Sequence, residues 1–107
     1  MKQRTLGQAH TPVAALGLGC MGMSEFYGAS DDTQSLHTLQ RALELGINFW
    51  DTADTYGFGH NESLLGQCIA QGGPTLREQL VIATKFGIVR QEGQYERRID
   101  NTPAYIR

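Results

Sequence analysis

Hydrophobic residues follow helical spacing over residues 31–45. The apolar positions that recur every three or four residues are Leu36, Leu39 and Leu43. Ser30 or Asp31 can cap the start of such a helix, and Gly46 follows its last apolar residue, where a left-handed residue commonly ends a helix. The pattern therefore predicts an amphipathic helix, with His37 off the apolar stripe and on the surface.

Two short apolar runs, "INFWD" at residues 47–51 and the run at residues 80–84, are typical of strands buried on both faces. Residues 61–73, "NESLLGQCIAQGG", again have helical spacing, with Asn61 as a cap and two glycines at the end. The apolar side of that helix holds Leu64, Leu65, Cys68 and Ile69. With an earlier strand at residues 13–18, strands and helices alternate at the size of a βαβ unit, which predicts a parallel sheet covered by helices.

The two ends of the chain follow other patterns. Residues 3–6 and 13–18 are expected to pair as a short hairpin across the turn "GQAHTP". Residues 91–100 have no periodicity and are interpreted as an exposed loop. Thr102 followed by Pro103 predicts the start of a third helix, which only four residues follow. A closed (β/α)8 barrel needs about 250 residues, so we expect a barrel that is cut off after its third strand.

Composition narrows the classes of function. The chain has 107 residues, of which 40% are hydrophobic and 19% charged, as expected for one domain or part of one. A net charge of −2 gives no electrostatic footprint for nucleic acid or an anionic membrane, and no apolar run is long enough to span a bilayer. The two cysteines, Cys20 and Cys68, are far apart, form no metal-type cluster and are expected to be reduced thiols. With no secretory signal in the first residues, we expect a cytoplasmic protein without a metal site.

Polar residues follow the predicted parallel strands at the edge where such folds bind ligands. Asp51 ends the second strand, Lys85 follows the third, and Tyr56 lies on the loop beyond Asp51. Hydride transfer to a carbonyl leaves negative charge on oxygen, so that a proton donor is needed. The ordinary pKa of tyrosine, about 10, is high for this task, and a neighbouring lysine would lower it. We therefore expect Tyr56 to be the general acid, Lys85 its tuner and Asp51 the anchor of that lysine.

Each of these residues also has a structural interpretation. Tyr56 before a glycine can be turn chemistry, Lys85 a solvated strand end, and Asp51 the cap of a turn. Their placement at successive strand ends is what favours a functional site.

Three segments resemble the N-terminal third of an aldo-keto reductase, over about residues 5–90. They are "GLGCMGMSEFYG", "ALELGINFWDTADTYGFGHNESLLG" and "VIATKFG". The sequences of these segments resemble the bacterial, plant and fungal branch of pyridoxal reductase-like enzymes more than the aldose reductase branch. The resemblance implies that residues 1–107 are a partial (β/α)8 domain of an enzyme that uses NADP(H) to reduce a small aldehyde or ketone.

Matching the family motif gives the same catalytic residues, Tyr56, Asp51 and Lys85. The resemblance further implies that Asp51 touches the nicotinamide ribose and that Cys20 and Met21 lie against the nicotinamide. It suggests a wall of the substrate pocket made of Phe26, Tyr27, Phe58 and His60. A solvated loop is the alternative for His60. The family's catalytic histidine and most of its NADP-binding segments have no counterpart in these residues.

Two alternatives stay open. The chain can be a non-catalytic barrel fragment or binding module that needs a partner, and its exposed sheet edges would allow self-association. It can also belong to another barrel enzyme, an aldolase or isomerase, in which Lys85 forms a Schiff base. Whether the chain is a reductase segment or a non-catalytic module, we expect the 107 residues alone to be inactive.

Overall fold

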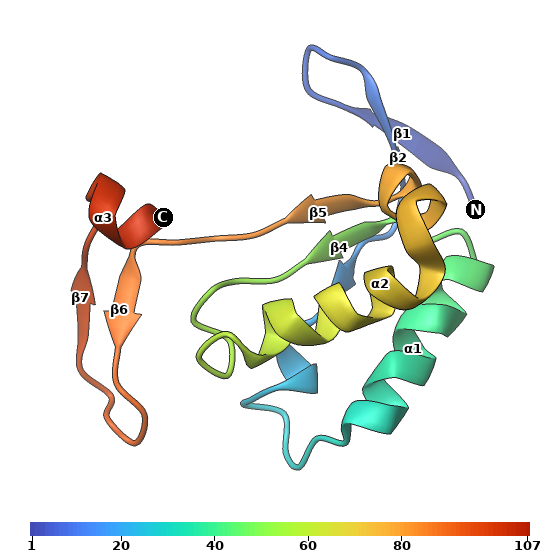
Figure 1. The fold of residues 1–107 in the computed structure, drawn as a ribbon. Coiled ribbons are helices and arrows are strands. Elements are labelled where there is room, and N and C mark those ends of the chain that lie inside the picture. The colour runs from blue at the N-terminus through green and yellow to red at the C-terminus, as the bar shows by residue number, and fades with distance from the viewer.

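A three-stranded parallel sheet forms the centre of the computed structural model, which describes residues 1–107 (Figure 1). Its strands are β3 (Leu18–Gly19), β4 (Phe49–Asp51) and β5 (Val81–Ala83), in the order β3-β4-β5. In register, Trp50 of β4 lies opposite Leu18 on one side and Ile82 on the other. The predicted parallel sheet is confirmed, and the outer edges of β3 and β5 carry no further strand.

Two helices pack on the same side of this sheet, α1 (Asp32–Glu44) and α2 (His60–Gln79). Asp31 caps α1 by accepting a hydrogen bond from the Gln34 amide at 2.8 Å, and Gly46 beyond its end has a φ of 77°, as predicted. His37 is exposed, also as predicted. The core between helices and sheet contains Cys20, Met23, Leu39, Trp50, Leu64, Leu65, Cys68 and Leu80.

Helix α2 corrects two expectations. Its N-terminal cap is Gly59 rather than Asn61, which lies inside the helix and is fully buried. The predicted end at the two glycines is a kink at Gly73, with φ 72° and ψ −173°, after which the chain resumes a helix to Gln79. Pro74 explains the resumption, because proline is well suited to the first turn of a helix.

The N-terminal hairpin is formed by β1 (Gln3–Leu6) and β2 (Thr11–Ala14). The apolar run at residues 13–18 was predicted as one strand, and this is wrong: the chain bends at residues 15–16 and passes from the hairpin into β3. Asn48, directly before β4, fastens the hairpin by accepting the Ala14 amide at 2.7 Å and donating to the Pro12 carbonyl at 3.4 Å. The hairpin therefore lies at the amino ends of the parallel strands, away from the predicted site.

A second hairpin lies beyond the carboxyl end of β5, where a loop was predicted. Its strands are β6 (Ile88–Arg90) and β7 (Arg97–Ile99), paired antiparallel. Residues 91–99 are exposed, as predicted, but the loop prediction was wrong at β7, which pairs with β6, and β6 is held in place by contacts with distant segments that are described below. The predicted third helix is confirmed as α3 (Pro103–Ile106), with the Thr102 side chain as its cap. No helix has both the length and the apolar character that crossing a membrane requires.

Candidate active site

Asp51, Tyr56 and Lys85 meet at the carboxyl edge of the sheet, as the sequence predicts. Lys85 Nζ donates to Asp51 Oδ2 at 2.7 Å and to the Tyr56 hydroxyl at 3.1 Å. It also donates to the Thr52 carbonyl at 2.8 Å. The backbones beyond β4 and β5 stay paired, since the Thr52 amide bonds the Ala83 carbonyl at 2.8 Å and the Asp54 amide bonds the Lys85 carbonyl at 3.2 Å. This backbone pairing fixes the positions of residues 51–56 relative to Lys85, so that the three side chains meet.

Lys85 is held as an ammonium ion. Partial burial lowers the pKa of Lys85, but the hydrogen bonds to Asp51 and Tyr56, together with the charge of Asp51, outweigh it and raise this pKa above its usual value. The side chains of Lys85 and Asp51 are 50% and 44% exposed, so that the pair remains open to a ligand. The arrangement places a permanent positive charge next to the Tyr56 oxygen, where it stabilises negative charge on that atom.

The loop that carries Tyr56 turns back tightly into α2. The Tyr56 amide bonds the Ala53 carbonyl, and the Tyr56 carbonyl accepts the Asn61 amide, both at 3.2 Å. Gly57 has a φ of 59°, and a Cβ at this position would lie 3.0 Å from Ser24 Cβ. Glycine is required here by both the backbone angle and the space.

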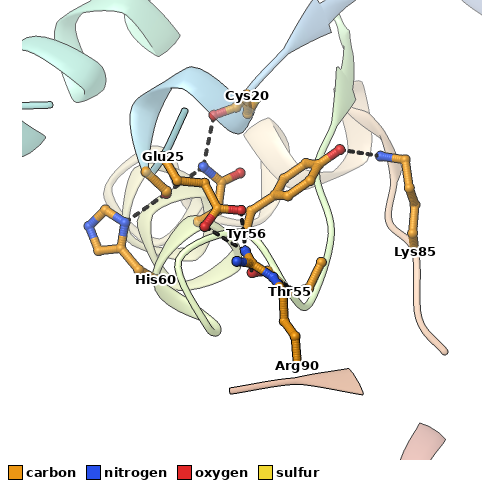
Figure 2. A network of polar contacts seen from close by, with 9 residues as sticks. Cys20, Glu25, Thr55, Tyr56, His60, Lys85 and Arg90 are labelled. Atoms are coloured by element: carbon orange, nitrogen blue, oxygen red, sulfur yellow. Dashed lines mark hydrogen bonds and ion pairs between the residues drawn. The ribbon is translucent and has the colours of Figure 1, made fainter. Parts of the chain in front are cut away.

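A buried polar network underlies this loop (Figure 2). Asn61 accepts from the Thr52 hydroxyl at 2.7 Å and donates to the Cys20 carbonyl at 2.8 Å and to Ser24 Oγ at 2.7 Å. His60 continues the network, with Nδ1 2.7 Å from Ser24 Oγ and Nε2 2.9 Å from Asp32 Oδ1. The network joins the segment after β3 to the loop after β4, which carries Tyr56.

Replacing Asn61 with alanine is expected to reduce the free energy of unfolding by about 2–4 kcal/mol, because several buried polar groups would lose their partners. Urea unfolding measures the change. The exposed Gln67→Ala variant in the same helix is the control and should change stability by no more than about 0.5 kcal/mol. Equal stabilities for the two variants would contradict the role given to the network.

Two neighbouring hollows border Tyr56. The smaller, about 160 Å³, is lined in part by Met21, Phe26, Lys85, Phe86, Ile88 and Arg90. The larger, about 360 Å³, is lined by Gly19, Met21, Gly22, Tyr27, Asp51 and Tyr56. Tyr56 and Met21 border both, so a ligand in either hollow would lie beside the Tyr56 side chain. Gly19 lines the larger hollow, and nothing lies within 4 Å of the position that a Cβ would take there.

The structure separates the predicted ligand-binding residues into three groups. Met21, Phe26 and Tyr27 border the hollows, as expected of pocket-wall or cofactor-facing residues. Phe58 stacks on Arg90 and borders neither hollow, and both ring nitrogens of His60 are hydrogen-bonded, to Ser24 and to the exposed Asp32. The His60 side chain is 38% exposed and lies at the start of α2, bordering neither hollow, so its place in a substrate-pocket wall stays a prediction.

The Cys20 thiol lies in the core and has no exposed surface. Burial raises the pKa of this thiol to about 11, and the Asp51 carboxylate adds to the rise. The Cys20 amide donates to the Asp51 carbonyl at 2.9 Å, so this residue can serve the edge of the sheet through its backbone. Its side chain is not among those that the hollows expose.

The Cys20 thiol gives a pH-dependent stability. Its ordinary pKa is 9.0, against about 11 in the folded chain, so between these values the unfolded chain binds fewer protons than the folded one. The free energy of unfolding is therefore expected to fall as pH rises through this window. Urea unfolding of the Cys20→Ala variant should show a smaller fall over the same window. Identical slopes would mean that the thiol does not stay protonated in the folded chain.

Sequence reasoning missed Arg90, which lies beside the site. Arg90 Nε donates to Thr55 Oγ1 at 2.7 Å, Nη2 donates to the Thr55 carbonyl at 2.8 Å, and the guanidinium pairs with Glu25. Arg90 comes just after an apolar strand end and before a polar stretch, a local pattern that distinguishes it from no other surface arginine. Only the fold shows that it lies within reach of the residue before Tyr56.

Comparison with known proteins agrees with this geometry. The model of the aldo/keto reductase family matches residues 15–107. The chain is 40% identical over 94 residues to "Aldo-keto reductase yakc [NADP(+)]" of Schizosaccharomyces pombe, a match that covers 88% of the chain and 27% of that protein. It is 38% identical over 103 residues to "Probable aldo-keto reductase 1" of Glycine max, covering 95% of the chain and 29% of that protein.

Among solved structures, the chain resembles aldo-keto reductase AKR11C1 from Bacillus halodurans in its holo form. The TM-score is 0.79 at 37% identity, and the match covers 99% of the chain but 33% of that structure. The chain thus spans about a third, or less, of the length of the relatives it matches. The solved relatives are TIM barrels, in keeping with the parallel strands and outer helices seen here. From the family match and from the convergence of Asp51, Tyr56 and Lys85, the chain belongs to the aldo/keto reductase family.

Proposed function

We propose that the protein to which these residues belong reduces aldehydes or ketones to alcohols with NADP(H), and that Tyr56 is its general acid. One observation carries the proposal: the Tyr56 hydroxyl lies 3.1 Å from an ammonium group that is itself anchored to Asp51. The name of the Schizosaccharomyces pombe relative includes NADP(+), which supports this cofactor.

The larger hollow suits a nicotinamide. It is lined by Gly19, which has no side chain to fill it, and by Asp51, Met21 and Tyr56. Asp51 and Met21 would contact the nicotinamide end, with Cys20 contributing only through its backbone. When bound, the cofactor supplies the hydride. We propose that segments outside residues 1–107 hold most of the cofactor, because the described hollow is too small for a dinucleotide.

The chain's own residues handle the proton. The carbonyl oxygen of a substrate in the smaller hollow would accept a proton from the Tyr56 hydroxyl as its charge develops. Lys85 would then stabilise the negative charge left on the Tyr56 oxygen, and Asp51 would keep Lys85 in place. Phe26 gives the hollow an apolar wall suited to the hydrocarbon part of a small carbonyl compound.

The geometry disfavours a Schiff-base lysine. Such a lysine must lose its proton, and burial or another cation generally lowers its pKa. Lys85 instead has a raised pKa, with a carboxylate and two further oxygen acceptors around its ammonium group. We therefore propose proton transfer from Tyr56, and not amine attack by Lys85, as the chemistry of this edge.

Carbonyl-dependent oxidation of NADPH by the protein at its natural length tests the proposal, with an aromatic aldehyde as substrate. Turnover that requires both NADPH and the aldehyde supports it. NADPH binding without turnover would instead favour a non-catalytic module, an alternative that the open edges of β3 and β5 permit through association with another chain.

A further inference from the structure

Arg90 joins three segments that are far apart in the sequence. It projects from β6, pairs with Glu25 in the segment after the short 3-10 helix at residues 21–23, and bonds Thr55 in the loop after β4 (Figure 2). Its guanidinium also lies over two aromatic rings, at 4.6 Å from the centroid of Phe58 and 5.5 Å from that of Phe26. We call this set of residues the Arg90 clamp: Glu25, Phe26, Thr55, Phe58 and Arg90.

The Arg90–Glu25 pair of the clamp is largely buried, unlike the other ion pairs of the chain. The side chains of Arg90 and Glu25 are 11% and 14% exposed, against 67% and 20% for Arg98 and Asp100 on the same hairpin. A buried pair with several hydrogen bonds fixes geometry, and removal of one partner leaves an uncompensated charge. Arg90 therefore sets the relative positions of the segments it joins, whereas Arg98 does not.

The two aromatic residues of the clamp have strained backbones. Phe26 has a φ of 70° and Phe58 a φ of 55°, and the only other non-glycine residue with a positive φ is His10 in the N-terminal hairpin. Bulky residues avoid this region, and they remain in it only when their surroundings impose it. Stacking on Arg90 supplies such a constraint for both phenylalanines at once.

The clamp lies directly beside the proposed acid. Thr55 precedes Tyr56 in the chain, and Arg90 binds both the side chain and the carbonyl of Thr55. Arg90 and Phe26 also border the smaller hollow together with Tyr56 and Lys85. A shift of the clamp would thus move the backbone that carries the Tyr56 hydroxyl relative to Lys85, which is anchored separately by Asp51.

We propose that Arg90 is a positioning residue: through Thr55, Glu25 and the two phenylalanines it holds the loop of Tyr56 in the conformation that proton transfer to a carbonyl requires. The inference rests on the proposed function for its catalytic consequence. Its structural part, that Arg90 orders the Tyr56 loop, does not depend on the proposed function and can be tested without an activity assay. The β6–β7 hairpin is then a fixed part of the site that acts on Tyr56 without touching the reacting atoms.

Hydrogen exchange of the protein at its natural length tests the structural part. The amides of Tyr56, Phe58 and Glu25 are each hydrogen-bonded, to the carbonyls of Ala53, Thr55 and Met21. In Arg90→Met these amides are expected to exchange at least about tenfold faster, an order set by the loss of one buried charge-assisted bond. The amides of α1 should be unchanged. Arg98→Met, on the same hairpin, is the matched control and should alter neither set.

Steady-state kinetics test the catalytic part. We expect Arg90→Met to lower kcat by about 10- to 100-fold, the order expected for a displacement of roughly 1 Å, with the KM for NADPH little changed. Arg90→Lys keeps the charge but loses the planar fork, and should fall between Arg90→Met and the unchanged protein. Arg98→Met should retain full kcat. Thr55→Val removes one hydrogen-bond partner of Arg90 with little change of shape and is expected to lower kcat several-fold. It tests the same role if Arg90→Met does not fold.

The outcomes separate the two proposals. If the protein without substitutions does not reduce carbonyl compounds, the proposed function is refuted. The hydrogen-exchange rates of the variants still decide whether Arg90 orders the Tyr56 loop. An active protein in which both Arg90→Lys and Thr55→Val keep full kcat and normal exchange at Tyr56 overturns the positioning role. A loss of thermal stability with unchanged kcat per folded molecule would also overturn it, because it would show that Arg90 acts on stability alone.

Discussion

Replacing Tyr56 with phenylalanine is expected to lower kcat for carbonyl reduction by about 10²- to 10⁴-fold, the usual range for loss of a general acid. Only the hydroxyl is removed, so the ring continues to border both hollows and the affinity for NADPH should stay close to that of the unchanged protein. Lys85 loses one of its three oxygen acceptors but keeps Asp51 and the Thr52 carbonyl. The decrease should therefore appear in the chemical step and not in the fold.

Tyr95→Phe provides the control, since Tyr95 is 95% exposed and lies at the tip of the β6–β7 hairpin. Steady-state turnover and NADPH binding, measured on both variants, separate the chemical step from cofactor affinity. A Tyr56→Phe variant with the turnover of the unchanged protein would remove Tyr56 from the mechanism, whatever its place in the structure.

Replacing Lys85 with methionine is expected to reduce kcat within the same range, about 10²- to 10⁴-fold. The variant keeps a side chain of similar length but loses the cation beside the Tyr56 oxygen, so negative charge on that oxygen is no longer stabilised. Because Lys85 and Asp51 are about half exposed, the free energy of unfolding should change by no more than about 1 kcal/mol. A large loss of activity with little loss of stability is the signature that distinguishes a catalytic lysine from a structural one.

Lys2→Met, a change at an exposed lysine near the N-terminus, controls for the loss of one positive charge. Turnover measured beside urea unfolding gives both quantities on the same preparation. Full activity in Lys85→Met, or an activity loss explained wholly by unfolding, would contradict the role assigned to the ammonium group.

The sequence predicted the parts of the fold that local rules control. Helix α1 has a regular apolar stripe, a capping Asp31 and a terminal Gly46, and the structure has each of them in place. The meeting of Asp51 with Lys85 was also predictable, because parallel strands bring their carboxyl ends to one edge. This meeting depends only on the order of the strands, and not on the conformation of any loop.

The errors lie where distant residues override local preference. Asn61 has the chemistry of a helix cap, but its partners Thr52, Ser24 and Cys20 draw it into the core. The β6–β7 hairpin has no periodic pattern, and its strand β6 is held by contacts of Arg90 with residues 35 to 65 positions away. No local property of Arg90 or of the polar segment after it could show these contacts, since they depend on which loops the fold brings together.

Transfer of deuterium from NADPH labelled at the hydride position tests the central claim most directly. The protein at its natural length is incubated with the labelled cofactor and an aromatic aldehyde, and the mass of the alcohol is measured for the unchanged protein and for Tyr56→Phe. The account predicts an alcohol heavier by about one mass unit from the unchanged protein, formed at least about 100-fold more slowly by the variant. Unlabelled alcohol, or equal rates for the two proteins, would contradict hydride transfer at a site in which Tyr56 donates the proton.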